Sequence, residues 1–452
     1  MNEPVIPDQQ TDVVRSSRGL NAADRLMLVA HQGLCALGHA GFSCQSHVWL
    51  DGCLDIDRLS DALGRLARRH PVVTSRIIEA ATPDAAWHSR ADAAPVIRVH
   101  SLADDTESSV LRQAEALLAE KWDLGAVDPI AFHLLRRPCG RVVLIVQWNH
   151  ALMDGKAPEL VLAELNRLTN AGTPTNENAP CDDAGDISAV VRRHSKRRRI
   201  IACSRIIASH VRRPARSITL EPVRKPAWVF KPIRIAVRTL DAAATTALSE
   251  RVRRTCGLLN LTPAILASVY RVMARLTPRQ ISPHSIFRTD VPLNLRSPGA
   301  TGPIFRNFMS FISLHAKKDE LQSRDELTRL LHRRMRDQLA RSADIGNLVL
   351  MEWLSRRPGM LHAHLLGRMQ KHPLTLGFGF LGPLTAGLTN VLEVPIERFY
   401  TLNTAMSPPG FTLQANLSRD QLNLAVTYIE AVIPESLAMA FLDGLGNDLI
   451  GE

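Results

Sequence analysis

Residues 142–155, VVLIVQWNHALMDG, decide how this sequence is interpreted. The first five are aliphatic and predict a strand that is buried on both faces of a sheet. His150, Asp154 and Gly155 follow this strand in the order His-x-x-x-Asp-Gly. A histidine in this position, beside a carboxylate and a tight turn, fits a general base. The alternative is a strand-exit turn with a surface histidine, in which Asp154 caps the next helix.

The neighbouring sequence alternates between helical and strand-like spacing. Apolar residues recur at helical spacing over 54–69 and 108–121, and a turn at 138–140 joins a strand over 131–135 to the strand over 142–148. A helix over 158–168 follows. A second half repeats this pattern, with expected elements at 233–237 (strand), 242–255 and 262–276 (helices), 287–295 (strand), 321–339 (helix), 374–380, 411–416 and 421–428 (strands) and 434–450 (helix). The pattern predicts an α/β protein built from two halves.

The segment between the halves has a different character. Residues 170–186 are rich in Asn, Thr, Pro, Gly and Asp, which predicts a loop. Residues 192–216 hold ten Arg or Lys and no acid, with isoleucines among them, and predict a basic amphipathic helix. This helix is a solvated connector or a peripheral contact with anionic lipid. Nucleic-acid binding is disfavoured because no recognised nucleic-acid motif accompanies the run.

The composition limits the class of protein. The chain has 452 residues, 45% of them hydrophobic, enough for a sizeable core and two or three domains. Neither a secretion signal nor a membrane span is recognisable, so we expect a cytoplasmic protein, with peripheral membrane contact through 192–216 left open. The seven cysteines form no Cys-x-x-Cys pair, so neither a disulfide framework nor a metal site is expected. A net charge of +11 favours anionic partners.

Residues 149–155 resemble the His-His-x-x-x-Asp-Gly motif of the condensation-domain and coenzyme A-dependent acyltransferase superfamily, which includes chloramphenicol acetyltransferase. Other stretches match this superfamily in the same order along the chain, over about residues 20–450. They are residues 63–77, Trp122-Asp123-Leu124 with Pro129, the strand VPLNLR at 291–296, and Pro408-Pro409-Gly410.

The resemblance implies an α/β sandwich of two chloramphenicol acetyltransferase-like subdomains, a pseudo-dimer with a central channel. We expect an N-terminal subdomain over 1–170, a basic linker over 171–226 and a C-terminal subdomain over 227–452. The implied activity is acyl transfer, in which His150 takes a proton from a hydroxyl or amine that attacks an acyl thioester. Acyl-coenzyme A or acyl-phosphopantetheine would be a co-substrate, and no permanently bound cofactor is expected.

The resemblance also assigns supporting residues. Asp154 is expected to point away from substrate and to pair with Arg296, while Gly155 permits a turn that a side chain would block. Asn149, Asn294 and Gly382 are expected along the substrate channel. Asn149 replaces the first histidine of the motif, and residues 379–382 replace the family's Asn-x-Gly turn. Residues 377–382 also fit Gly-x-Gly-x-x-Gly, but Pro383 follows and no long helix opens there, so a dinucleotide site is disfavoured.

Three functions remain open from the sequence. The first is an acyltransferase that acts on a small-molecule or lipid acceptor. The second is a condensation enzyme of peptide or polyketide assembly whose substrates are bound to an acyl carrier protein. The third is a catalytically silent scaffold that binds a carrier protein or a membrane. Dependence on a carrier protein separates the first two, and replacement of His150 separates both from the third.

Overall fold

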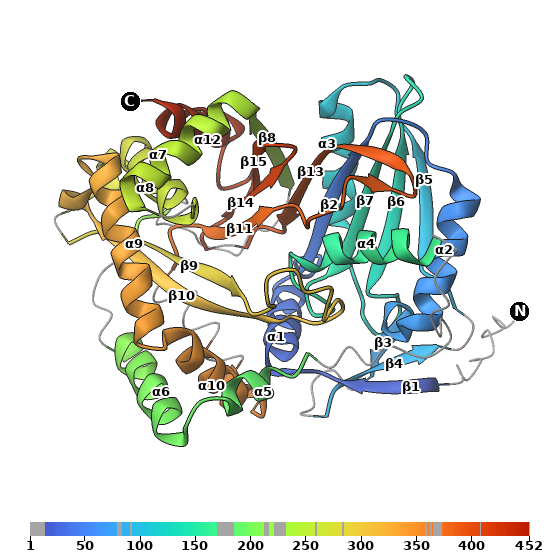
Figure 1. Cartoon of the computed structure of the whole chain (residues 1–452), viewed down its shortest axis with the longest axis horizontal. Coiled ribbons are helices and arrows are strands. Elements are labelled where there is room, and N and C mark those ends of the chain that lie inside the picture. The colour runs from blue at the N-terminus through green and yellow to red at the C-terminus, as the bar shows by residue number, and fades with distance from the viewer. Residues whose placement is uncertain are drawn as a thin grey trace, which may run out of the picture.

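The computed structural model describes residues 14–78, 84–90, 93–169, 185–211, 217–220, 232–257, 260–282, 284–357, 359–361, 364, 373–406 and 408–451. Two α/β halves lie side by side, the N-terminal half on the right of Figure 1 and the C-terminal half on the left. Helix α1 (Ala22–Ala36) lies between them in this view, and its contacts with α10 (Ala343–Ser355) join the halves.

The N-terminal half is organised by a six-stranded sheet in the order β12-β13-β2-β7-β6-β5. Its central strand is β7 (Val142–Asn149), which pairs antiparallel with β2 (Ser43–Leu50) and β6 (Ile130–Arg136) and is buried at every position. Leu144 and Val146 pack into the main core, whereas Val143 and Ile145 pack into the core beneath α3. The prediction of a strand buried on both faces is confirmed.

Helices cover both faces of this sheet. They are α2 (Ile56–Arg69) and α4 (Ala157–Thr169) on one face and α3 (Glu107–Ala119) on the other. Helix α2 begins after Asp55, whose side chain accepts backbone hydrogen bonds from Asp57 and Arg58, and it ends before Pro71. The edge strand β5 (Val96–Ser101) runs parallel to β6. A small sheet, β1-β4-β3, completes this half with Val14–Gly19, Ala86–Arg90 and Ser75–Ile78.

The C-terminal half contains a four-stranded sheet and a separate hairpin. The sheet has the order β11-β14-β15-β8, formed by Gly377–Pro383, Phe411–Ser418, Gln421–Ile429 and Ile233–Leu240. The hairpin pairs β9 (Ile286–Asn294) with β10 (Met309–Lys317). The packed helices are α7 (Ala242–Cys256), α8 (Thr262–Leu276), α9 (Arg324–Ala340) and α12 (Glu435–Ile450).

One long strand connects the two halves. β13 (Val394–Asn403) comes from the C-terminal half of the sequence but pairs antiparallel with β2, and the short β12 (Asn390–Val391) extends the sheet beyond it. The range expected for the C-terminal subdomain therefore supplies two strands of the N-terminal sheet. The expected boundaries at 170 and 226 lie outside the described residues.

Part of the expected basic linker is helical. It contains α5 (Ile187–Arg192) and α6 (Lys196–Val211), and α6 packs on α10. A Cβ at Gly346 would lie 2.6 Å from the backbone oxygen of Ala202, so this contact brings the two helices unusually close. None of the described helices is long and apolar enough to cross a membrane.

Candidate active site

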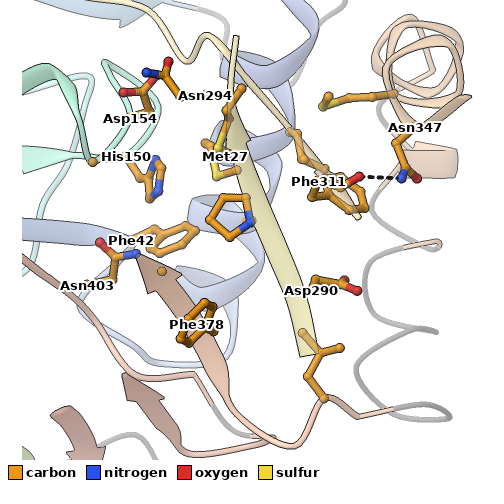
Figure 2. A pocket seen from close by; sticks show the side chains of 18 of the residues that line it. Met27, Phe42, His150, Asp154, Asp290, Asn294, Phe311, Asn347, Phe378 and Asn403 are labelled. Carbon is orange, nitrogen blue, oxygen red and sulfur yellow. Dashed lines mark hydrogen bonds between the residues drawn. The ribbon is translucent and has the colours of Figure 1, made fainter. Parts of the chain in front are cut away.

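A cavity of about 370 Å³ lies where α1, the β9–β10 hairpin, β11 and α10 meet. His150 lines it, together with Asp154 and Asn294 (Figure 2). Gly155 also borders it. Residues from the beginning, middle and end of the chain therefore surround one space. Among the described residues, no group of three or more His, Cys, Asp or Glu side chains is placed to hold a metal ion.

His150 is fixed at the end of the buried strand. Its backbone N–H donates to the carbonyl of Phe42 at 2.9 Å, which attaches the strand exit to the segment before β2. The Phe42 ring lies 4.8 Å from the imidazole, centroid to centroid. The His150 side chain is only 6% exposed, so its ring faces the cavity rather than the outer surface. The surface-histidine alternative is therefore wrong.

Asn307 determines which nitrogen of His150 carries the proton. The Asn307 amide Nδ2 donates to the carbonyl of His150 at 2.8 Å and to Asp24 Oδ1 at 3.0 Å. Both partners are acceptors only, so the amide orientation is set and Asn307 Oδ1 is left facing His150 Nδ1 at 3.1 Å. Nδ1 must then be the protonated nitrogen, and Nε2 is left with a lone pair for proton transfer.

Asp24 holds Asn307 in this orientation. It is fully buried, sits in the first turn of α1 within a capping box with Asn21, and also accepts the backbone N–H of Asn307 at 2.8 Å. Arg306 pairs with its other oxygen at 3.2 Å. The carboxylate therefore links α1 to the loop after β9, and through that loop to His150.

The environment keeps His150 neutral. Burial lowers its pKa below the ordinary value of 6.5, because the charged imidazolium is poorly solvated there. The charge of Asp154 and the hydrogen bond that His150 Nδ1 donates to Asn307 Oδ1 act in the opposite direction. A histidine whose pKa is below 6.5 is in the basic form at neutral pH, as a general base requires.

Asp154 and Arg296 form the ion pair that was expected for them. Arg296 donates to Asp154 Oδ2 at 2.7 Å, and the two side chains are 2% and 6% exposed. The same oxygen accepts the backbone N–H of Phe308 at 2.8 Å, and Arg296 also donates to the carbonyl of Pro303. These bonds connect the His150 loop to the β9–β10 hairpin. Asp154 is thus committed to structural contacts even though it borders the cavity.

The structure gives Gly155 a different role from the one expected. Its φ is not positive, so the turn does not need the backbone freedom of glycine. A Cβ here would lie 3.2 Å from Leu381 Cδ2, so glycine provides space for β11 to approach. The expectation that a side chain would block the turn itself is wrong.

The residues expected along the channel separate into two groups. Asn294 lines the cavity, whereas Asn149 and Gly382 are not among its lining residues. Asn149 is fully buried, donates to His31 Nδ1 at 2.9 Å and accepts from the backbone N–H of Ala151 at 3.0 Å. It stabilises the strand exit against α1. Gly382 lies near the end of β11 with a φ of +72°, a conformation that favours glycine.

Comparisons with known proteins bear mainly on the fold. No protein-family model matches the chain. A curated relative, the polyketide synthase-nonribosomal peptide synthetase pyiS of Pyricularia grisea, is 29% identical over 136 residues. That match covers 27% of this chain and 3% of the relative, so the chain corresponds to a small part of that protein.

Solved structures match over almost the whole chain. The first condensation domain of the CDA synthetase superposes with a TM-score of 0.71 at 16% identity, covering 96% of this chain and 97% of the other. The trichothecene 15-O-acetyltransferase TRI3 of Fusarium sporotrichioides superposes with a TM-score of 0.69 at 12% identity, covering 96% and 95%. The chain therefore has the same fold as these two proteins, which is the expected arrangement of two chloramphenicol acetyltransferase-like subdomains.

Proposed function

We propose that this protein transfers an acyl group from a thioester to a hydroxyl or amine acceptor, with His150 as the general base. The observation that carries the proposal is the arrangement of His150: one ring nitrogen is bound by Asn307 and the ring lines a cavity. The likeness to a condensation domain and to an acetyltransferase supports a transferase.

The proposed reaction needs one proton transfer in each direction. Nε2 of His150 takes the proton of the acceptor hydroxyl or amine as the oxygen or nitrogen attacks the thioester carbonyl. The tetrahedral intermediate then collapses, the carbon–sulfur bond breaks, and the departing thiolate takes the proton from the imidazolium. The products are the ester or amide and the free thiol. No covalent acyl-enzyme forms, and His150 ends in its starting state.

The acyl donor is either coenzyme A or the phosphopantetheine arm of a carrier protein. A mass-spectrometric screen of acyl-coenzyme A donors and acyl-carrier donors against alcohols and amines would identify the substrates. We expect His150→Ala to abolish every transfer that the wild type performs. His284→Ala is the matched control, because His284 is exposed. A wild-type biological effect that persists in His150→Ala would instead favour the scaffold function.

A second proposal concerns peripheral contact with an anionic membrane through 192–216, of which residues 192–211 are described. Ile200, Ile201 and Ile207 of α6 are 56%, 40% and 48% exposed, although α6 packs its opposite side on α10. Arginines and Lys196 share the outward half of this helix, so apolar and cationic groups are interleaved there. Such a surface suits the interface of an anionic bilayer.

Vesicle sedimentation tests this contact. We expect binding to vesicles that contain phosphatidylglycerol and not to pure phosphatidylcholine, with a loss of at least fivefold in the double variant Ile200→Ser and Ile207→Ser. Ile450→Ser is the control, because Ile450 is 48% exposed on α12. Unchanged sedimentation of the double variant would contradict the proposal.

A further inference from the structure

The wall of the cavity beside His150 is mainly apolar. Its apolar side chains come from α1, β10, β11 and α10. They include Met27, Met309, Leu350, Met351 and Phe378. Figure 2 shows Met27 and Phe378 around the space in front of His150. A wall of this kind binds a ligand by removing apolar surface from water rather than by directed hydrogen bonds.

Methionine is prominent in this wall. Met27, Met309, Met351 and Met406 all line the cavity, and they come from different parts of the chain. The unbranched thioether side chain adopts many shapes at little cost, so it fills gaps around an irregular or flexible ligand. Such a wall suits a flexible hydrocarbon chain better than a rigid polar molecule.

The charged groups at the cavity do not favour an anionic ligand. Lys156 is the one lysine or arginine among the described lining residues, and its ammonium is bound by Glu159 Oε2 at 2.5 Å and by the carbonyl of Pro383 at 2.8 Å. The Asp154 carboxylate is paired with Arg296. Asp290 lies across the cavity from His150 (Figure 2). A buried carboxylate or phosphate would find no uncommitted cation here, which makes its burial costly.

We infer that this cavity binds an uncharged aliphatic chain carried by one of the two substrates. The chain is either the acyl group of the donor or the alkyl part of the acceptor. A cavity of about 370 Å³ is within the size range of small-molecule sites. The inference rests on the proposed function, because the reacting end of the chain would lie at His150 while the donor phosphates stay outside.

Binding to the His150→Ala protein tests the inference without turnover. The probes are S-alkyl coenzyme A thioethers and, separately, n-alkanols, each of increasing chain length and measured by calorimetry. We expect affinity in one series to rise about threefold to fourfold per added methylene until the cavity is full. A rise with the thioethers assigns the chain to the donor, and a rise with the alkanols assigns it to the acceptor. Affinity that ignores chain length in both series overturns the inference.

Two variants of opposite effect locate the chain. Leu350→Trp narrows the cavity and should weaken the longest ligand at least tenfold while leaving the shortest unchanged. Met351→Ala enlarges the cavity, so the aliphatic chain that binds most tightly should be longer than in the wild type. Met439→Ala is the matched control, because Met439 is 41% exposed on α12. Variants that change the affinity of all chain lengths equally would place the chain elsewhere.

A charged group at the end of the aliphatic chain provides a further test. A chain with a terminal carboxylate should bind at least tenfold more weakly than the alkyl chain of equal length, and equal binding would contradict the inference. The outcomes also separate this inference from the proposed function. Binding that depends on chain length in a protein that transfers no acyl group would refute the function alone. Transfer that depends on His150, combined with binding that ignores chain length, would refute the cavity inference alone.

Discussion

Two buried histidines, one within β2 and one directly after the neighbouring strand β7, differ in how their ring nitrogens are bound. Both ring nitrogens of His47 on β2 are occupied, Nε2 by Gln45 at 2.9 Å and Nδ1 by the hydroxyl of Tyr400 at 3.1 Å. Only Nδ1 of His150 is bound by its neighbour Asn307, and the ring lines a cavity. Burial lowers the pKa of both. Burial and a lowered pKa therefore do not distinguish a candidate base, whereas one ring nitrogen beside a cavity does.

The largest expected effect comes from replacing each histidine in turn. His150→Ala should lower the rate of acyl transfer by about 10²- to 10⁴-fold, the usual contribution of a general base, with little change in the free energy of unfolding. His47→Leu should do the reverse. It removes the His47 partner of Gln45 Oε1 and of the Tyr400 hydroxyl, costs about 1–3 kcal/mol of stability, and spares transfer per folded molecule. Steady-state kinetics and urea unfolding measure both, and loss of transfer in folded His47→Leu protein would break the comparison.

A second prediction concerns the ion pair that holds the His150 loop. Asp154→Ala leaves the buried guanidinium of Arg296 uncompensated and should cost about 3–5 kcal/mol in the free energy of unfolding. The control is Glu120→Ala, whose partner Arg98 lies in a pair that is about half exposed, and it should cost less than about 1 kcal/mol. Equal costs for the two variants would show that Asp154 does not anchor the loop.

Asn307 is expected to affect proton transfer by His150 as well as the stability of the fold. Asn307→Leu removes a hydrogen bond that raises the pKa of His150, so that pKa should fall further. The rate plateau should drop by about tenfold because the ring loses its fixed orientation, and the acid limb of the pH–rate profile should move to lower pH. A profile with a lower plateau and an unchanged midpoint would mean that Asn307 acts only through stability.

The smallest effects appear in the pH dependence of the wild type. Transfer should fall as His150 becomes protonated, with its midpoint below pH 6.5, because burial lowers that pKa. Stability should also fall below about pH 6.5. The unfolded chain then protonates His47, whereas the folded protein, in which its pKa is about 3, does not. Each such histidine contributes a slope of about 1.4 kcal/mol per pH unit between these values. His47→Leu should show a shallower slope, and an identical slope would contradict this account.

Sequence patterns predicted the regular parts of the fold correctly. The aliphatic run before His150 is β7, and helices such as α2 and α8 lie within a few residues of their expected ranges. Apolar residues recur at regular spacing in these elements because one face or both faces pack on apolar neighbours. The superfamily resemblance supplied the pairing of Asp154 with Arg296, which no local pattern encodes.

The elements that were missed have polar residues in buried positions or depend on distant contacts. β2 was not expected because Gln45, Ser46 and His47 interrupt its apolar pattern, yet all three are buried and form hydrogen bonds to neighbouring strands. Asn307 contacts Asp24 across 283 positions of sequence. The Asn21-x-x-Asp24 spacing signals a helix start, but nothing in it reveals that Asp24 also orients an amide in the distant half.

The pairing of β13 with β2 has a consequence for synthesis of the chain. β2 occupies positions 43–50 and its partner positions 394–403, so one edge of β2 stays unpaired until translation has passed position 394. An open strand edge in a nascent chain is a site for wrong pairing with other chains. Buried polar groups on β2 act against such pairing. His47 binds the hydroxyl of Tyr400 on the correct strand, and a strand without a matching polar group would leave this buried bond unmade.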